Sequence, residues 1–182
     1  MPGKRAVGQH LDRQKQFDTV FADHHVAVAH YCVRRLGPVE GEDAAADVFA
    51  VAWKRLQDLP PPEQIRAWLL GVAYRVVANH YRSRRRRLRL AHRLAFEPFP
   101  VVTRTESVDA QLLRQALGGL GSRDREVLRL WSWDQLTREE MAAILGITEN
   151  AVDQRLFRAR ARLRRRMELL QDDPSHPVGD HA

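Results

Sequence analysis

The chain has 182 residues, 44% of them apolar, so it is long enough for one ordinary domain or for two small ones with packed cores. Its 30 lysines and arginines exceed its 23 acidic residues and give a net charge of +7, which favours a polyanionic partner. No apolar run approaches the roughly 20 residues that span a bilayer, no signal-peptide core opens the chain, and Cys32 is the single cysteine, so we expect a cytoplasmic protein without a disulfide or a cysteine-rich zinc site.

The first part of the chain is predicted to form two helices around a short break. Apolar residues at steps of three and four predict a helix from Gln14 to Leu36. The segment 37–41, Gly-Pro-Val-Glu-Gly, is expected to end it, and a second helix is expected from Glu42 to about Leu56. Trp53 falls at the edge of that helix's apolar stripe, which consists of Ala45, Val48, Phe49, Ala52 and Leu56.

A third and longer helix is predicted to begin near Glu63, because the prolines at 60–62 enforce an extended loop before it. Its expected inner stripe is Ile65, Trp68, Leu69, Val72, Val76 and His80. From Tyr81 to Arg89, six of nine residues are arginines, which would repel one another unless a polyanion lay alongside. The alternative is a solvated helix end without a ligand.

The middle of the chain is predicted to be a linker followed by two short helices. Residues 91–106 show no sustained period and include Glu97-Pro98-Phe99-Pro100. A helix is expected over Asp109–Leu117, ended by the glycine-rich segment 118–121. Ser122 is expected to cap the next helix, which runs to about Trp131 with Val127, Leu128 and Trp131 facing inward.

The region from Thr137 to about Arg166 has the pattern of a helix-turn-helix. Thr137 and Glu140 have the spacing of a capping box, in which each side chain bonds the other residue's backbone N–H. Gly146 supplies a left-handed turn residue, Ile147 is expected to plug the core, and Thr148 is expected to cap the following helix.

That following helix is predicted to have a packing face and a nucleic-acid face. The inward residues are Val152, Leu156, Ala159 and Leu163, and a basic stripe contains Arg155, Arg158, Arg162 and Arg165. Asn150, Asp153 and Gln154, near the start of the helix, are hydrogen-bonding types that can address base edges. The alternative is a basic helical hairpin without groove specificity.

With both halves placed, the chain resembles an extracytoplasmic-function sigma factor, a small member of the sigma-70 family with regions 2 and 4 only. The resemblance is carried by Asp43–Trp53, by Ile65–Arg87 with its Arg-Ala-Trp-Leu core, and by the motifs Asp124–Leu128 and Leu156–Arg160. It implies an all-α fold of two small helical domains joined by a flexible linker. The expected parts are a flexible N-terminus (1–13), a region 2-like domain (14–90), the linker (91–106), a region 4-like domain (107–170) and a disordered tail (171–182).

The same resemblance implies an initiation factor that binds core RNA polymerase, recognises the minus-10 and minus-35 promoter elements and helps to open the duplex. It implies no covalent chemistry, cofactor, metal or small-molecule substrate, and it makes an anti-sigma factor an expected partner. By this analogy, core polymerase would meet Asp47, Val48, Phe49 and Trp53, although Phe49 can equally be core. The minus-10 strand would meet Arg75, Asn79, Arg82, Arg84, Arg85 and Arg86, with Trp68 favoured as core over base stacking. The minus-35 groove would meet Asn150, Asp153, Gln154, Arg155, Phe157, Arg158 and Arg162.

Four positions depart from the family pattern. Arg75 stands where many relatives carry asparagine, Ala46 replaces a common glutamine, and Gln135 replaces a common glycine before the helix-turn-helix. Asp153 stands where relatives often place a basic or small residue. A carboxylate there would repel phosphate but could accept from a cytosine amino group, so an unusual minus-35 sequence is predicted.

Two other classes of protein compete with this interpretation. The first is a helix-turn-helix regulator acting without polymerase, with residues 1–90 as a sensor or dimerisation domain, against which the arginine-rich helix end argues. The second is a metal-dependent nuclease using Glu42, Asp43 and Asp47, but no third ligand, histidine base or phosphate-binding glycine loop is in register.

Overall fold

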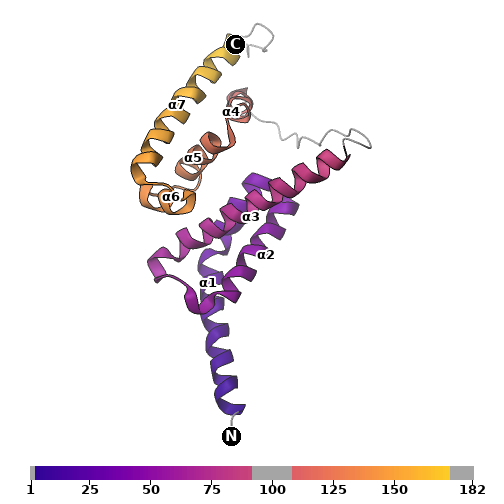
Figure 1. The fold of residues 1–182 in the computed structure, drawn as a ribbon, viewed down its shortest axis with the longest axis vertical. Coiled ribbons are helices and arrows are strands. Elements are labelled where there is room, and N and C mark those ends of the chain that lie inside the picture. Colours follow the sequence, from indigo (N-terminus) through magenta and orange to yellow (C-terminus); the bar gives the residue numbers. More distant parts are fainter. Residues whose placement is uncertain (1–2, 92–107, 173–182) are drawn as a thin grey trace, which may run out of the picture. The chain divides into compact units, whose positions relative to one another are not determined.

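The computed structural model describes residues 3–91 and 108–172, and the chain divides into two compact units, residues 1–96 and 97–182. The described residues form seven α-helices and one short 3-10 helix, with no strand among them, which confirms the prediction of an all-α protein (Figure 1). The predicted linker, apart from Ala91 at a helix end, and the tail beyond Asp172 lie outside the described residues.

The first unit is built from three long helices. They are α1 (Gly3–Leu36), α2 (Pro38–Lys54) and α3 (Pro62–Ala91), with the 3-10 turn η1 (Leu56–Asp58) between the last two. Each long helix packs against the other two. The N-terminal turns of α1 and the C-terminal, arginine-rich turns of α3 run past the packed part of the unit (Figure 1).

The first two helices differ from the prediction at their starts. Residues 3–13 continue α1 instead of preceding it, because no turn signal separates them from the packed part and a nucleated helix propagates readily. The predicted five-residue break is reduced to Gly37, whose φ is 89°, and Pro38 opens α2, since proline is favoured at the first helical position. Gly41 therefore lies within α2, where it is buried against α1.

The core of the first unit lies where the three helices meet. As predicted for α2, Ala45, Val48, Phe49, Ala52 and Leu56 are buried. The buried face of α3 is rotated relative to the prediction: Leu69 and Val72 are buried as expected, but Leu70, Ala73 and Val77 join them. Ile65, Trp68, Val76 and His80 are only partly covered. The reason is that α3 packs against two helices and not one, so a wider arc of its surface is buried.

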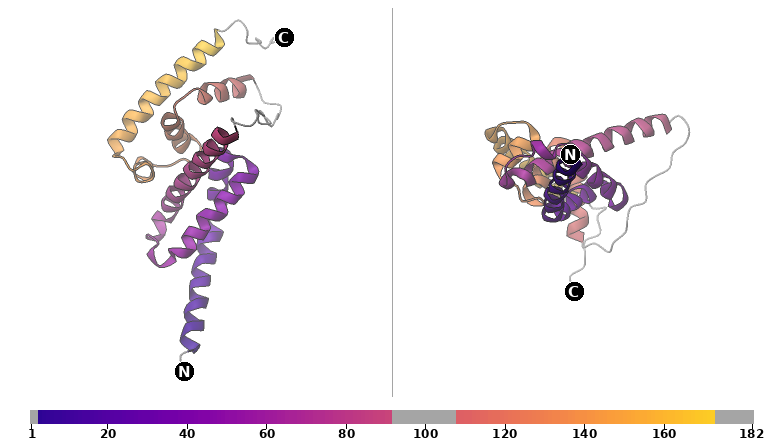
Figure 2. Two further views of the ribbon diagram at one scale, coloured as in Figure 1. Left: turned by 45° about the vertical axis from the view of Figure 1, so that its right-hand side comes forward. Right: turned by 90° about the horizontal axis from the view of Figure 1, so that it is seen from below.

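The second unit contains three short helices packed against one long one. The short helices are α4 (Val108–Gly118), α5 (Ser122–Ser132) and α6 (Arg138–Leu145), and the long one is α7 (Glu149–Gln171). Helix α7 contacts all three. The left view of Figure 2 shows α7 running alongside the shorter helices. The buried apolar residues are Leu112, Ala116, Leu120, Val127, Leu128, Leu130, Leu136, Met141, Ile144, Val152, Leu156 and Ala159.

Two predictions for α5 are wrong. Gly121, not Ser122, is the N-cap residue, and it provides no side-chain cap. Trp131 does not face inward: it is 46% exposed, whereas Leu130 beside it is fully buried. A large indole can occupy the edge of a helix stripe at little cost, and the rotation of α5 on α7 decides which neighbour is enclosed.

Arg125 fastens α5 to the end of α4. Its Nε donates to the carbonyl of Leu117 at 2.9 Å, and Nη2 donates to the carbonyls of Gly118 at 2.7 Å and Leu120 at 2.9 Å. Helix C-termini leave carbonyls without intrahelical donors, and a guanidinium fork can satisfy several at once. Arg125, part of the motif that carried the family resemblance, therefore has a structural role.

Candidate nucleic-acid interface

Helices α6 and α7 form the predicted helix-turn-helix with its local signals in place. The Glu140 backbone N–H donates to Thr137 Oγ1 at 3.2 Å, and the Thr137 N–H donates to the Glu140 carboxylate at 2.8 Å. Gly146 ends α6 in the left-handed conformation with φ of 65°. Thr148 Oγ1 accepts from the Ala151 N–H at 3.2 Å and caps α7. The capping box, the turn glycine and the second cap are confirmed. Ile147, in contrast, is only half-buried.

Helix α7 separates a packing face from an exposed outer face. Val152, Leu156 and Ala159 are buried. On the outer face Phe157 is 76% exposed, and Asn150, Gln154 and Arg158 are exposed beside it. Arg158 Nη2 donates to Gln154 Oε1 at 3.0 Å, so two predicted base-reading side chains already touch. A large exposed aromatic ring flanked by polar side chains is typical of a binding surface.

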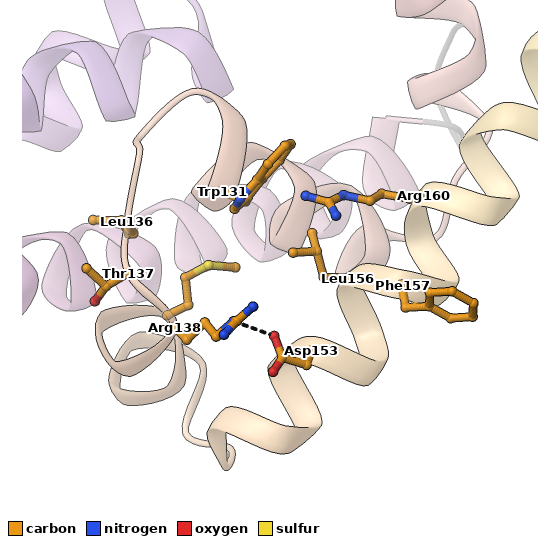
Figure 3. Close-up of a pocket in the computed structure, with 9 residues that line it drawn as sticks. Trp131, Leu136, Thr137, Arg138, Asp153, Leu156, Phe157 and Arg160 are labelled. Carbon is orange, nitrogen blue, oxygen red and sulfur yellow. Dashed lines mark ion pairs between the residues drawn. The ribbon is translucent and has the colours of Figure 1, made fainter.

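Asp153 has a partner that the sequence did not predict. Its Oδ1 lies 2.7 Å from Nε of Arg138, the first residue of α6, so an ion pair joins the two helices of the motif. Figure 3 shows this pair at the rim of a hollow of about 360 Å³ whose wall includes Trp131, Leu156 and Arg160. The Arg160 guanidinium lies 3.9 Å from the Trp131 ring centroid, a cation–π contact that covers part of the exposed indole.

The opposite flank of α7 is basic and is held by one acidic residue of α5. Asp124 pairs with Arg162, which spans the two helices. These two side chains line a polar hollow of about 150 Å³ together with Ala151, Gln154, Arg155 and Arg158. Three of the predicted minus-35 arginines, Arg155, Arg158 and Arg162, thus gather on one flank of α7, and Asp153 lies on the other.

In the first unit, the predicted minus-10 residues follow the far end of α3. Arg75, Asn79, Arg82 and Arg86 are exposed, and Arg84 is half-buried. Asn79 Oδ1 accepts from Arg82, and Arg86 Nη2 donates to Ser83 Oγ at 3.4 Å. The side chain of Arg85 lies outside the described residues. Tyr81 donates its hydroxyl hydrogen to the Arg35 carbonyl and so anchors this part of α3 to the end of α1.

The predicted polymerase-binding residues of α2 divide into core and surface. Val48 and Phe49 are buried, and the Phe49 ring packs 4.7 Å, centroid to centroid, from that of Phe21. Trp53 is half-buried and makes an edge contact with Phe17 at 5.2 Å between centroids. Asp47 is exposed, with Oδ2 3.7 Å from Nε2 of His80 on α3. Only Asp47 and Trp53 of the four therefore present side-chain surface, because the other two fill the bundle.

Comparisons of the chain with known proteins point to one family. Residues 20–87 match the family model "Sigma-70 region 2", and residues 110–163 match "Sigma-70, region 4". The RNA polymerase sigma factor CnrH of Cupriavidus metallidurans is 33% identical over 164 residues, which cover 82% of this chain and 85% of that one.

The chain is an extracytoplasmic-function sigma factor of the sigma-70 family. Its fold agrees with solved structures of such factors. The structure of CnrH in complex with the cytosolic domain of CnrY aligns with a TM-score of 0.63 and 28% identity, over 88% of this chain and 90% of that one. The Bartonella quintana sigma factor RpoE, solved with the anti-sigma factor NepR, aligns with a TM-score of 0.67 and 24% identity, over 87% and 99%, and supports the fold.

The two matched regions coincide with the two structural units, which we call the region 2 unit (α1 to α3) and the region 4 unit (α4 to α7) of this sigma factor. Within residues 3–91 and 108–172 no helix has the length and apolar character needed to cross a membrane. Over the same ranges, no group of three or more histidine, cysteine, aspartate and glutamate side chains is placed to hold a metal ion.

Sequence reasoning missed three side chains of this sigma factor's candidate interface: Arg138, Trp131 and Arg160. Arg138 directly follows the Thr137 cap, and the local pattern gives it no role of its own. Its distance of fifteen residues from Asp153 gives no local signal, since the contact depends on how the turn orients α6 against α7. The pairing of Trp131 with Arg160 likewise joins α5 to α7 across the unit.

Proposed function

We propose that α7 of the region 4 unit reads the minus-35 element in the major groove. The carrying observation is the outer face of α7, where Gln154, Phe157 and Arg158 stand exposed on a helix whose opposite face is buried in the unit. Glutamine can address adenine, arginine can address guanine, and an apolar ring can contact a thymine methyl. The arginine-rich flank would hold the phosphates and supply the salt-dependent part of the affinity.

For the minus-10 element we propose the exposed side of α3 from Arg75 to Arg86. Arg82 and Arg86 are exposed and would neutralise the backbone of a separated strand. Asn79 remains the candidate for base contact, although Arg82 must release it or share it on binding. In this arrangement Tyr81 fixes the helix while the arginines bind.

For core RNA polymerase we propose the surface of α2 that carries Asp47 and Trp53. Val48 and Phe49 would support this surface from beneath, because both are enclosed by the bundle. Trp53 is a suitable anchor, since a half-buried aromatic side chain loses little conformational freedom when a partner covers it. The protein would thus act in the cytoplasm, with the polymerase, and without making or breaking a covalent bond.

An anti-sigma factor is the proposed regulator. Sigma factors of this type are often held inactive by a dedicated protein partner, and the relative CnrH has been solved with the cytosolic domain of CnrY bound. A pull-down from the native cell with the full chain as bait tests this part. Recovery of a stoichiometric partner that is displaced by core polymerase is expected, and recovery of polymerase subunits alone would contradict it.

The experiment that tests the proposed function is transcription by the full chain with purified core polymerase on a library of randomised promoters. We expect initiation from a subset that shares two elements. Arg82→Ala/Arg86→Ala should reduce opening at the minus-10 element, and Gln154→Ala/Arg158→Ala should reduce dependence on the minus-35 element. Arg123→Ala removes an exposed arginine outside both surfaces and should behave as wild type.

Two results would overturn the proposal. Failure to initiate from any promoter in the library would contradict the function, and equal loss of both elements in both double variants would contradict the division of roles. Copurification with core polymerase separates a sigma factor from the competing helix-turn-helix regulator, because a free-standing regulator has no need of the polymerase.

A further inference from the structure

The ion pair between Arg138 and Asp153 lies in an unusual place for a surface contact. It joins the first residue of α6 to the recognition helix, with 67% of the Arg138 side chain and 46% of the Asp153 side chain exposed. In Figure 3 the two side chains point toward one another across the gap between the helices, while Phe157 one turn further along α7 points away from them. Two residues of the proposed reading face lie close to Asp153. Gln154 follows it in sequence, and Phe157 lies about one helical turn further along.

A lone carboxylate at this position would weaken binding to DNA. Phosphates repel it, and a desolvated charge without a partner in the groove is costly. Arg138 compensates the charge, with its Nε 2.7 Å from Oδ1 of Asp153. An ionised carboxylate offers about four acceptor sites, so Asp153 keeps the capacity to accept from a base while it is paired. Among base edges in the major groove, the amino group of cytosine is a donor that suits a carboxylate acceptor.

We propose that Arg138 is a specificity-determining positioning residue, which holds the Asp153 carboxylate at the groove face as an acceptor for a cytosine amino group. This inference rests on the proposed minus-35 function of α7. It makes two helices, not one, responsible for a single base preference. Arg138 contributes without touching the base, because it fixes the orientation of the carboxylate and balances its charge.

The pair also constrains Arg138. While Asp153 pairs with Arg138, the guanidinium is less available to phosphates. The pair therefore lowers the affinity for DNA of any sequence and raises the preference for one base. Removing Asp153 frees a cation close to the DNA, whereas removing Arg138 leaves an anion there. The two single substitutions should therefore agree in their effect on base preference and differ in sign in their effect on general affinity.

The test uses holoenzyme formed from the full chain and core polymerase, with a duplex library randomised at the minus-35 element and with non-specific DNA at several salt concentrations. Wild type should prefer cytosine at one strand position about tenfold, and Asp153→Ala and Arg138→Ala should both abolish this preference. For non-specific DNA, Asp153→Ala should make the slope of log affinity against log salt concentration steeper by about one. Arg138→Ala should weaken binding to the same DNA. Arg138→Lys keeps the charge but not the fork, and should restore general affinity more than preference.

A matched control is Glu168→Gln, which removes an exposed carboxylate near the C-terminal end of α7, outside the proposed reading face. It should change the preference at no base pair. Arg138→Gln repeats the loss of charge but keeps part of the aliphatic stem, so that an effect of lost side-chain packing in the alanine variant is recognised. Unchanged preference in Arg138→Gln, combined with lost preference in Asp153→Ala, would overturn the positioning role. Unchanged preference in both would overturn the inference altogether. A wild-type holoenzyme that selects no minus-35 motif would instead defeat the proposed function on which the inference rests.

Discussion

At the scale of single residues, Gln135 is the clearest point of backbone strain. It is the sole non-glycine residue in the described ranges with a positive φ, at 52°. It lies in the turn from α5 to α6, where the Leu136 N–H donates back to the Leu130 carbonyl at 3.1 Å. An L-amino acid in the left-handed region costs about 1–2 kcal/mol relative to the right-handed one. The turn requires a positive φ at this position, which glutamine disfavours.

Gln135→Gly should therefore stabilise the region 4 unit, by about 1 kcal/mol or less once the extra freedom of glycine in the unfolded chain is subtracted. The measurement is hydrogen exchange of the α5 and α6 backbone amides in the full chain. Gln115→Gly, the same exchange within helix α4, is the control and should destabilise the unit by about 1 kcal/mol. Exchange in Gln135→Gly that is no slower than in wild type would show that the turn at Gln135 is not strained.

His24 should make the stability of the region 2 unit depend on pH. Partial burial lowers the pKa of its imidazole below 6.5, and Arg66 lowers it further, while Asp23 acts in the opposite direction. The folded state thus binds a proton at His24 less readily than the unfolded state does. The stability contributed by neutral His24 is complete above pH 6.5 and is lost as the pH falls from 6.5 through the lowered folded pKa.

Denaturant midpoints at pH 7.5 and pH 5.5 check this prediction. The wild-type region 2 unit should lose stability between the two, and His24→Gln should reduce that loss, because a neutral amide does not titrate. His30→Gln, an exposed histidine on the same helix, is the control and should leave the wild-type difference intact. Equal pH dependence in wild type and His24→Gln would refute the assignment.

At the scale of elements, the spacing between α1 and α2 depends on Gly41. A Cβ added there would lie 2.5 Å from the Cα of Val33 and 2.7 Å from its backbone nitrogen. These atoms belong to the backbone of a packed helix, so they cannot move aside as a flexible side chain can. The close approach brings the aromatic and aliphatic side chains of the two helices into one core.

Gly41→Ala should destabilise the region 2 unit by about 1–3 kcal/mol, because the two helices must separate to admit the methyl group. Chemical denaturation followed by circular dichroism measures the loss. Gly118→Ala is the control: its Cβ would meet no atom within 4 Å, and alanine favours the helix, so this variant should be neutral or slightly stabilised. A neutral Gly41→Ala would mean that α1 and α2 are less tightly packed than described.

Helix α7 combines a packing face with the face that we propose for recognition. Its inward stripe encloses the region 4 core, and its two flanks carry opposite local chemistry, with Asp153 facing α6 and the arginines facing Asp124 of α5. Each flank is tied to a different short helix by an ion pair. A change in the orientation of α6 or α5 would thus alter the side chains that α7 presents on its two flanks.

At the scale of the whole molecule, the two units have separate cores. The buried residues of α1 to α3 contact one another, and those of α4 to α7 do the same. Residues 3–91 and 108–172, produced as separate proteins, should therefore each retain cooperative thermal unfolding and a helical circular dichroism spectrum. Loss of helicity in either fragment alone would show that its fold needs the other. As a control, the chain is cut within α3 at residue 75, which divides the first core. The N-terminal fragment that ends there should be unfolded.

The sequence by itself determined the features that are encoded within a few neighbouring residues. The helices, the Thr137 capping box, the Gly146 turn and the Thr148 cap follow from local preferences, and the structure agrees with each. The family could also be recognised from the order of three elements along the chain. They are an acidic and aromatic helix, an arginine-rich helix and a helix-turn-helix. These signals survive without knowledge of the packing, because hydrogen-bond capping and backbone conformation act between residues close along the chain.

The tertiary structure decided everything that depends on the rotation of one helix against another. It turned Trp131 outward and Leu130 inward, brought Leu70, Ala73 and Val77 into the buried face of α3, and placed Gly41 against α1. It also gave Asp153 its partner Arg138. Helix periodicity defines a stripe only to within about a residue, and contacts between elements depend on angles that no local pattern contains. The helix-turn-helix was therefore predictable from the sequence, whereas the pairing of the Asp153 charge with Arg138 was settled by the packing of α7 against α6.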